Sequence, residues 1–338
     1  MTNLTIKDIA KMCGVSTTSV SFVINNRDGV SEATRQKVQE VIRRTGFTPN
    51  VHTRRLNLGK SFTIHVVLRR YEYSLYNQFA LESLIGIFRA SKPLGYSIIF
   101  TFADDDTGCE QLMESVRSKD CDGVILNQVS DPTLIAMLQR EAIPFVCVDA
   151  HIRKDGSLPL VEVDYLDAAR QATMLLSSNG HREIGFIGPD TPYEYYVSTF
   201  NGYAGALRDA GLVCNPAWMT SVPYQDETAA TVCISEILQR RPLPTAFFCA
   251  GDAVAIDMIR CARQCGLRVP EDLSIMSLDD LIVSRYVDPP LSTMTFDKEL
   301  LGERAMQLLH QIMDEQPYDP VHLIPTTPIC RGTIKTLT

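Results

Sequence analysis

The sequence of 338 residues lacks several features that would place it in common functional classes. It has no run of 18 or more apolar residues, so no segment is predicted to cross a membrane. Its first eight residues contain no apolar core of a signal peptide, and we therefore expect a cytoplasmic protein. The ten cysteines show no C-x-x-C spacing. Cys261 and Cys265 have no histidine beside them, so we expect reduced thiols, no metal site and no cofactor.

Common catalytic motifs are also missing from the sequence. It contains no G-x-S-x-G nucleophile elbow, no phosphate-binding loop and no H-E-x-x-H zinc motif. His181 is a candidate catalytic base, but it lies in a predicted turn between a helix and a strand. We therefore expect a structural role for His181 and do not expect an enzyme.

Positive charge is scarce except at the N-terminus. The net charge is −8, yet residues 1–60 carry ten Lys/Arg and only four Asp/Glu, whereas the rest carries 22 and 36. A small basic segment on an acidic body is typical of nucleic-acid binding by that segment. A solvated basic face is the alternative interpretation.

The basic segment has the pattern of a helix-turn-helix. Residues 5–13 form a predicted amphipathic helix capped by Thr5 and followed by Gly14, which suits a sharp turn. Ser16 caps a second predicted helix at 17–24, and a third begins at Ser31. The second helix opens with short hydroxyl residues, as a helix that reads base edges does. An ordinary three-helix bundle is the alternative, which the basic excess disfavours.

Four segments of this region closely resemble the head of the LacI family of bacterial repressors: 5–10, 14–21, 30–35 and 46–50. The resemblance implies a homodimeric transcription regulator that binds a palindromic double-stranded operator and responds to a small molecule, a sugar or sugar derivative. Such a protein associates with the nucleoid when it is bound to DNA. The resemblance assigns DNA contacts to Thr5, Ser16, Thr17, Thr18, Ser21, Phe22, Asn25, Ser31, Thr34, Asn50, Arg54 and Leu56.

Phe22 departs from the family pattern, and the role of Leu56 depends on the family's hinge. The family often has Arg or His where this chain has Phe22, and an aromatic ring contacts a thymine methyl rather than guanine. Residues 49–60 correspond to the family's hinge, in which Leu56 would wedge into the minor groove. Thr53 replaces the usual alanine there, and a packing role is the alternative for Leu56.

After residue 60, short apolar strands alternate with helices, which predicts parallel sheets covered by helices on both faces. The predicted strands are 63–68, 96–102, 123–126, 145–148, 161–163, 184–187, 218–222, 246–250 and 273–278. The predicted helices are 76–91, 108–118, 132–141, 167–178, 197–210, 227–239 and 253–265. This length exceeds one typical domain, so two lobes are expected, with ligands at the carboxyl ends of the strands.

Residues 180–188, 267–275 and 289–293 extend the resemblance through this body and imply a periplasmic-binding-protein-like fold. The expected fold class is a small all-α helix-turn-helix head followed by a two-lobed α/β body with parallel sheets. The expected domains are a DNA-binding head at 1–48, a hinge at 49–60, a first lobe at 61–162 plus 292–320, and a second lobe at 163–291 plus 321–338.

Family positions also assign the effector contacts to Arg69, Tyr73, Phe79, Asp149, Tyr195, Thr199, Tyr224, Asp252, Asp279 and Phe296. Thr199 stands where the family usually has Arg, and Gly251 where it usually has Asn. Arg69 follows the first strand, where small polar residues are usual, and this exchange indicates an effector with an anionic or strongly polar end. The alternatives are that the carboxylates cap helices or pair with cations, and that the pocket binds no effector.

Two further alternatives concern the class of function. A solute-binding protein of a transport system would share the body but would lack residues 1–60 and would carry an export signal. Within the regulator class, repression that a ligand releases is favoured over corepression, and control by a partner protein stays open.

Overall fold

The computed structural model describes residues 4–24, 27–47, 59–68, 78–102, 106–190, 193–223 and 226–337. The chain divides into two compact units, Met1–Phe62 and Thr63–Thr338. Among the described helices, none is long and apolar enough to cross a membrane.

The first unit is a three-helix head, made of α1 (Ile6–Cys13), α2 (Thr17–Ile24) and α3 (Glu32–Thr45). Gly14 ends α1 in the left-handed conformation at φ 63°, which an L side chain adopts only at a cost. The buried side chains of the three helices, together with Phe47 after α3, form the head's own core: Ile9, Ala10, Cys13, Val20, Val23, Val38, Val41 and Phe47. The predicted helix-turn-helix is confirmed.

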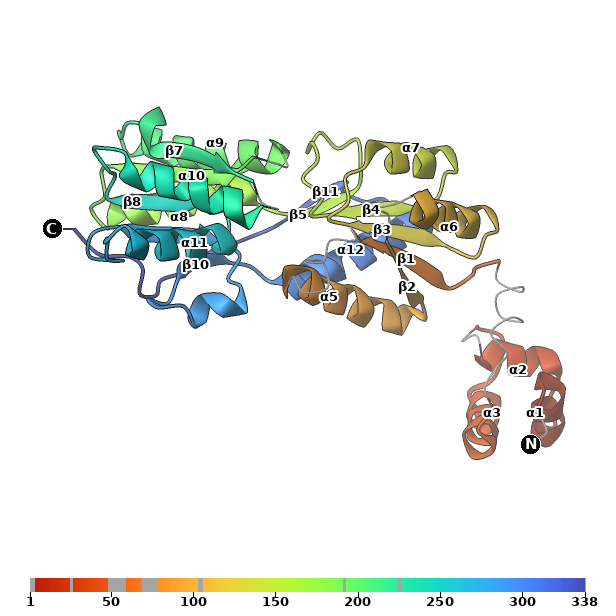
Figure 1. Ribbon diagram of the computed structural model, residues 1–338. Helices are drawn as coiled ribbons and strands as arrows, with labels where there is room; N and C mark the ends of the chain where they lie inside the picture. The colour runs from red at the N-terminus through yellow and green to blue at the C-terminus, as the bar shows by residue number, and fades with distance from the viewer. Residues whose placement is uncertain are drawn as a thin grey trace. The chain divides into compact units, whose positions relative to one another are not determined.

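The second unit contains two six-stranded sheets in its described part, each at the centre of one lobe (Figure 1). The first sheet has the order β11 (Val321–Ile324), β5 (Leu160–Val163), β4 (Phe145–Val148), β3 (Gly123–Asn127), β1 (Thr63–Leu68) and β2 (Ser97–Phe102). The second has the order β12 (Thr327–Ile329), β10 (Ser292–Thr295), β9 (Ser274–Leu278), β8 (Ala246–Cys249), β6 (Ile184–Pro189) and β7 (Met219–Val222). All described pairings are parallel except that of β12 with β10.

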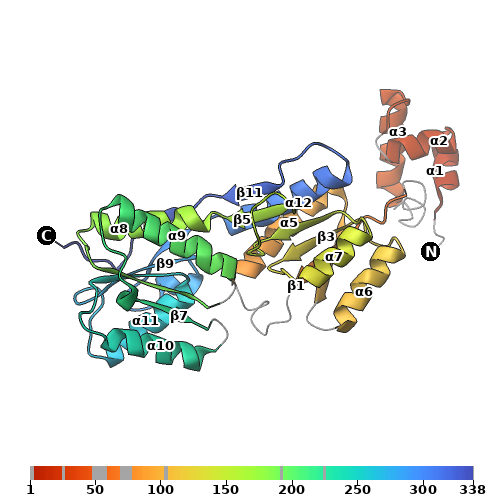
Figure 2. The ribbon, with the colours of Figure 1, turned by 90° about the horizontal axis from the view of Figure 1, so that it is seen from above.

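Helices cover the faces of both sheets, as the view from above shows (Figure 2). The first lobe has α5 (Gln78–Leu94), α6 (Asp106–Arg117), α7 (Pro132–Arg140) and α12 (Lys298–Met313). The second has α8 (Tyr165–Ser178), α9 (Tyr193–Asp209), α10 (Glu227–Gln239) and α11 (Asp252–Gln264). All residues of β1 and β6 are buried, because a strand covered on both faces has no solvent-facing side. The predicted two-lobed α/β body is confirmed.

The chain crosses between the two lobes at other points than the sequence analysis predicted. Residues 292–320 were assigned to the first lobe, but β10 pairs with β9 of the second sheet. Residues 321–338 were assigned to the second lobe, but β11 pairs with β5 of the first sheet. The chain enters the first lobe again only at α12, a helix that the sequence analysis did not assign, and returns to the second at β12. The lobe to which a strand belongs depends on the strand it pairs with, and hydrophobic periodicity predicts a strand without predicting its pairing partner.

Glycines allow α5 and α12 to lie side by side although they are far apart in sequence (Figure 1). A Cβ on Gly86 would lie 1.9 Å from the carbonyl oxygen of Glu299, and one on Gly302 would lie 1.9 Å from that of Ser83. The two backbones therefore touch, and no larger residue fits at either position without separating the helices. This contact fixes where α12, and the residues just before it, meet the first lobe.

Candidate DNA-binding and effector-binding sites

Three of the predicted DNA contacts are the caps of the three head helices. The side chain of Thr5 caps α1 and forms a reciprocal pair with Asp8, whose carboxylate accepts from the Thr5 backbone N–H at 2.8 Å. Ser16 Oγ accepts from the N–H of Ser19 at 3.0 Å, and Ser31 caps α3. Exposed helix N-termini present N–H groups and a partial positive charge, which suits contact with phosphate. The caps set how each helix begins.

The outer face of α2 is open to solvent. Thr17 and Thr18 are exposed, and Ser21 is half-buried, so their hydroxyls can reach base edges. Thr34, on α3, is half-buried and its Oγ1 lies 2.9 Å from Ser31 Oγ.

Phe22 is positioned differently from a side chain that points into solvent to contact bases. It is half-buried, and its ring lies so close to Gly29 that a Cβ there would be 3.2 Å from the ring edge. Arg27 donates its backbone N–H to the carbonyl of Phe22 at 2.8 Å. The ring therefore packs against Gly29, in the segment before α3. Asn25, Asn50, Arg54, Leu56 and most of the predicted hinge at 49–60 lie outside the described residues.

In the body, Asp149 follows the carboxyl end of β4 and has a left-handed backbone, φ 47°. Its side chain is 1% exposed and accepts hydrogen bonds from Tyr165 Oη at 2.7 Å and from Gln128 Nε2 at 3.0 Å. Burial raises the pKa of Asp149, and the charge of His151 partly opposes this rise.

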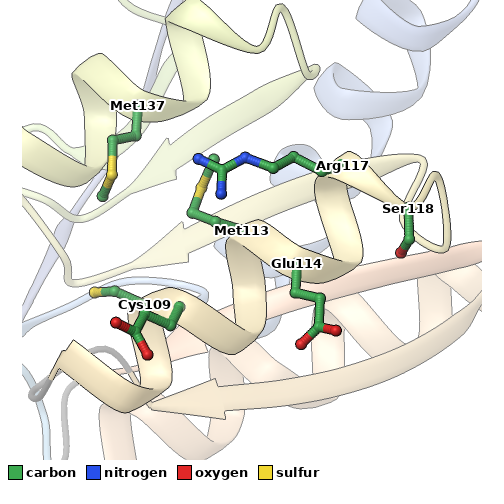
Figure 3. A pocket seen from close by; sticks show the side chains of 7 residues that line it. Cys109, Met113, Glu114, Arg117, Ser118 and Met137 are labelled. Atoms are coloured by element: carbon green, nitrogen blue, oxygen red, sulfur yellow. The ribbon is translucent and has the colours of Figure 1, made fainter.

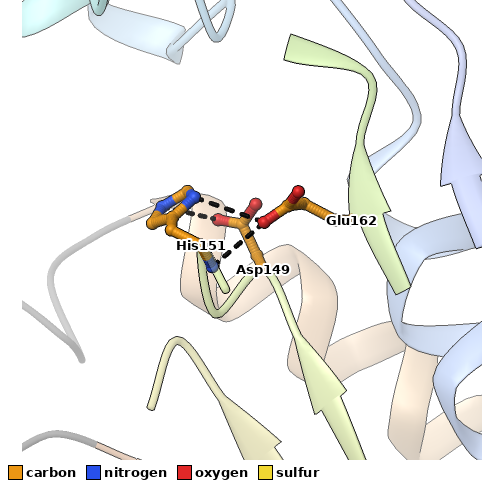
Figure 4. A group of neighbouring side chains, drawn as sticks. All are labelled: Asp149, His151 and Glu162. Carbon is orange, nitrogen blue, oxygen red and sulfur yellow. Dashed lines mark hydrogen bonds and ion pairs between the residues drawn. The ribbon is translucent and has the colours of Figure 1, made fainter. Parts of the chain in front are cut away.

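A second buried carboxylate, Glu162 of β5, belongs to the same group of side chains (Figure 4). Lys154 Nζ lies 2.7 Å from its Oε2, and the backbone N–H of His151 donates to its Oε1 at 3.0 Å. Burial alone would raise the pKa of Glu162, but the contacts with His151 and Lys154 outweigh it and the pKa is lowered.

Asp149, His151 and Glu162 also offer one ligand atom each within 4.8 Å of one another. A metal ion would need one nitrogen of His151 to face both carboxylates, but Nε2 faces Asp149 and Nδ1 faces Glu162. Lys154 already supplies positive charge to Glu162. The arrangement therefore fits a cationic imidazole better than a metal ion.

Asp279 lies at the carboxyl end of β9, where a ligand cleft is expected. Burial raises the pKa of its carboxyl well above the usual 3.8, and the charges of Asp252 and Asp149 add to this rise while Lys298 opposes it. Asp149 of the first lobe and Asp279 of the second therefore lie within electrostatic reach of each other.

Asp252, at the start of α11, is fully buried and has all its partners inside the protein. Its Oδ1 accepts from Ser277 Oγ at 2.5 Å and Thr293 Oγ1 at 2.6 Å, and its Oδ2 accepts from Ser284 Oγ at 2.5 Å and the N–H of Leu281 at 2.8 Å. These donors come from β9, β10 and the loop after Asp279. The structure thus places Asp252 at the centre of an internal hydrogen-bond network. Gly251 before it has φ 130°, a conformation that asparagine adopts poorly.

Thr199 is likewise turned inward. It is fully buried on α9, and its Oγ1 donates to the carbonyls of Tyr195 at 2.8 Å and Tyr196 at 3.2 Å. Tyr195 itself packs against His151 at 4.9 Å and Tyr165 at 4.6 Å between ring centroids. The aromatic face of α9, rather than Thr199, meets the first lobe.

Two further predicted effector residues, Phe79 and Phe296, form an aromatic pair. Phe79 of α5 and Phe296, just after β10, lie edge to face at 5.5 Å, and both are nearly buried. Lys298 Nζ lies 4.6 Å from the centre of the Phe296 ring, with only 4% of the residue exposed. The sequence analysis missed Gln128, His151 and Lys298. Gln128 directly follows β3, and such a position after a strand is the signal that could have indicated it.

Two cavities lie in the described part of the body. One of ≈ 120 Å³ is lined from both lobes by His151, Ile152, Lys154, Glu162, Tyr165, Glu194, Tyr195 and Ser198. The other, of ≈ 570 Å³, lies along α6 and is lined by Cys109, Glu110, Met113, Glu114, Arg117, Ser118 and Met137 (Figure 3). Only the smaller cavity contains a predicted effector residue. Arg69, Tyr73 and Tyr224 lie outside the described residues.

His181 has a structural role in the turn before β6. It is buried, its Nδ1 lies 2.9 Å from Thr245 Oγ1 and its Nε2 lies 3.0 Å from the carbonyl of Lys335. Both ring nitrogens are thus engaged, Nδ1 with the residue before β8 and Nε2 with the C-terminal segment.

Known proteins resemble the chain along nearly its whole length. Residues 5–50 match the model of bacterial regulatory proteins of the lacI family, and residues 173–334 match that of a periplasmic binding protein-like domain. The ribose operon repressor of Haemophilus influenzae is 30% identical over 328 residues, covering 96% of this chain and 96% of the relative. The HTH-type transcriptional repressor PurR of the same species is 29% identical and covers 98% and 99%.

Solved structures agree with the sequence relatives. The transcriptional regulator CelR–cellobiose complex superposes with a TM-score of 0.74 at 27% identity, covering 98% of this chain and 99% of that chain. The lac repressor dimer bound to operator and the anti-inducer ONPF superposes with a TM-score of 0.77 at 24% identity, covering 99% and 100%. With its helix-turn-helix head and two-lobed body, the chain belongs to the LacI family and is a DNA-binding transcriptional repressor with an effector domain.

Proposed function

We propose that this repressor acts as a homodimer on a palindromic operator of a carbohydrate or related metabolic operon, and that a sugar or sugar-derived effector between the two lobes controls its affinity for DNA. A repressor that binds chromosomal DNA would lie in the cytoplasm, at the nucleoid. We further propose that it has no catalytic activity, since the relatives named above are repressors.

One observation carries the effector proposal: Asp149 and Asp279 each follow the carboxyl end of a strand, in different lobes, and the charge of Asp149 contributes to the raised pKa of Asp279. Asp149 is buried and Asp279 is half-buried, so a ligand that offers hydrogen-bond donors would stabilise both carboxylates. Sugar hydroxyls are such donors, and aromatic rings at Tyr195, Phe79 and Phe296 offer apolar surface for the sugar ring. We assign direct effector contact to these five residues, and a positioning role to Asp252 and Thr199, whose partners are internal.

The polar end of the effector would meet Arg69. Isothermal titration of the full chain with D-ribose and with D-ribose 5-phosphate tests this part of the proposal. We expect the phosphate to bind more tightly, and Arg69→Ala to remove that preference. Tight binding of the neutral sugar that Arg69→Ala leaves unchanged would contradict it.

Dimer formation is supported by an apolar surface on the first lobe. Leu81, Ile85 and Phe88 share one face of α5 and are 41%, 42% and 56% exposed. Ile99 and Phe100 of the edge strand β2, on which α5 packs, are 43% and 52% exposed. Exposed apolar side chains gathered on adjacent elements are typical of protein interfaces. A second copy of the chain, bringing a second head to the operator, is the partner that fits this surface.

The experiment that tests the function is capture of genomic fragments. The purified protein is incubated with sheared DNA of its source genome, washed at moderate salt, and the retained fragments are sequenced. We expect a short palindrome beside metabolic genes. Uniform recovery without a motif, also in the presence of small-molecule cell extract, would contradict sequence-specific regulation.

A further inference from the structure

His151 lies between two buried carboxylates. It follows β4 with a left-handed backbone, φ 52°, and its side chain is 17% exposed. Its Nε2 lies 3.8 Å from Asp149 Oδ2, and its Nδ1 lies 3.5 Å from Glu162 Oε1 (Figure 4). A neutral imidazole would direct its one nitrogen lone pair at a carboxylate, whereas an imidazolium presents N–H groups to both. The geometry therefore favours the protonated ring.

The surrounding charges lead to the same protonation state. Lys154 balances one of the two carboxylates at 2.7 Å from Glu162. A protonated His151 balances the other, which leaves the buried group neutral. Buried charge is costly unless it is paired, so the neutral arrangement is the stable one.

The same ring also connects the lobes. Its centroid lies 5.4 Å from that of Tyr165 and 4.9 Å from that of Tyr195, which belong to α8 and α9 of the second lobe. Tyr165 in turn donates its hydroxyl to Asp149. On this side the nearby charged groups are Glu194, which lines the cavity and pairs with Arg153 at 3.9 Å, and Asp279, which acts electrostatically on Tyr165.

We propose that the imidazolium of His151 is a positioning residue of the effector site, which holds Asp149 in its binding orientation and joins the first lobe to Tyr165 and Tyr195 of the second. The inference rests on the proposed function, because it takes Asp149 as an effector contact. It predicts that the stability of this contact between the lobes depends on the protonation of His151.

The sign of the pH dependence follows from the contacts. Burial alone would lower the pKa of His151, but Asp149 and Glu162 outweigh it and raise the pKa above 6.5. The stabilisation is therefore complete below pH 6.5 and is lost as the pH rises through the raised value. The pKa of Glu162 is lowered, so its own contribution is lost only as the pH falls through that lowered value.

Histidine titration by NMR tests the inference on the full chain, labelled with ¹³C at the Cε1 atoms of its six histidines. His151→Gln identifies the signal, and His65, whose pKa is lowered by burial, is the internal reference. We expect His151 to titrate above pH 6.5. Removing a carboxylate by Glu162→Gln should lower its pKa, and removing the ammonium by Lys154→Met should raise it.

Titration of His151 at or below pH 6.5, or the same pKa in all variants, would overturn the inference. A shift of its signal by stoichiometric Zn²⁺ would instead identify Asp149, His151 and Glu162 as metal ligands and would also overturn it. As a second measurement, the melting temperature of the wild type should fall relative to His151→Gln as the pH rises above 6.5, and parallel profiles would count against it. Capture of genomic DNA is independent of His151, so failure of the proposed function is recognised separately.

Discussion

Replacement of Asp252 separates a structural role from an effector contact. The carboxylate is fully buried and accepts four hydrogen bonds that join the start of α11 to β9, β10 and the loop after Asp279. Asp252→Ala would leave the donors of Ser277, Ser284, Thr293 and Leu281 without this acceptor. Asp252→Asn would keep the shape and one acceptor oxygen.

The size of the effect follows from these contacts. Removing one partner of a buried charged network costs about 3–5 kcal/mol, and we expect this range for Asp252→Ala. In Asp252→Asn the amide oxygen accepts from the N–H of Leu281, and its NH₂ group faces the hydroxyls of Ser277 and Thr293. A hydroxyl can rotate and accept, so the cost falls to about 1–2 kcal/mol.

Tryptophan fluorescence in urea measures this difference directly. Trp218 is the chain's single tryptophan, lies in the second lobe beside β7 and is 7% exposed. Its signal therefore reports unfolding of the lobe that contains Asp252. The midpoint should shift to lower urea in the order wild type, Asp252→Asn, Asp252→Ala, with a similar slope.

The opposite pattern would refute the reasoning. If both variants unfold at the wild-type midpoint but lose binding of D-ribose or its phosphate, Asp252 touches the effector and is not a support. Thr199→Val is the matched control, because its hydroxyl donates only to carbonyls of its own helix in the described contacts and a smaller change is expected.

Three further predictions concern other parts of the chain. Gly302→Ala should destabilise the first lobe by about 3 kcal/mol, because its methyl group would meet the immobile carbonyl of Ser83, and hydrogen exchange in α5 and α12 measures this loss. Thr5→Ala should lower the stability of the head by about 1 kcal/mol, as measured by calorimetry of its unfolding, and an unchanged melting temperature of the head would argue against the cap. Phe88→Glu should turn dimers into monomers in analytical ultracentrifugation, whereas Val213→Glu, at a 73% exposed position, should not.

Local patterns were sufficient to predict the helices of the head and most strands of the body. In the head, apolar residues at helical spacing and Gly14 encode the fold within a few neighbouring residues. In the body, each fully buried strand stands between turns, so β1 and β4 were predicted with their observed bounds. The helix α12 and the strands β11 and β12 were not predicted, and β10 was placed in the wrong lobe.

The candidate site was predictable only in part. Asp149 and Asp279 each follow the carboxyl end of a strand, which is the edge of a parallel sheet where ligands bind, but they belong to different sheets and only the fold brings them near each other. The partners of His151 could not be predicted, because Glu162 and Tyr195 come from different elements and meet it only in the folded body. Whether the predicted DNA and effector contacts bind their ligands stays a prediction.

The sequence by itself determined the family, the helix-turn-helix head and the alternation of strands and helices, because these depend on neighbouring residues and on periodicity. Only the tertiary structure decided that Asp252 and Thr199 turn inward, that Phe22 packs against Gly29, and that His151 lies between two carboxylates. Burial and hydrogen-bond partners are set by elements distant in the chain. A side chain's role in this protein therefore follows from what surrounds it as well as from its residue type.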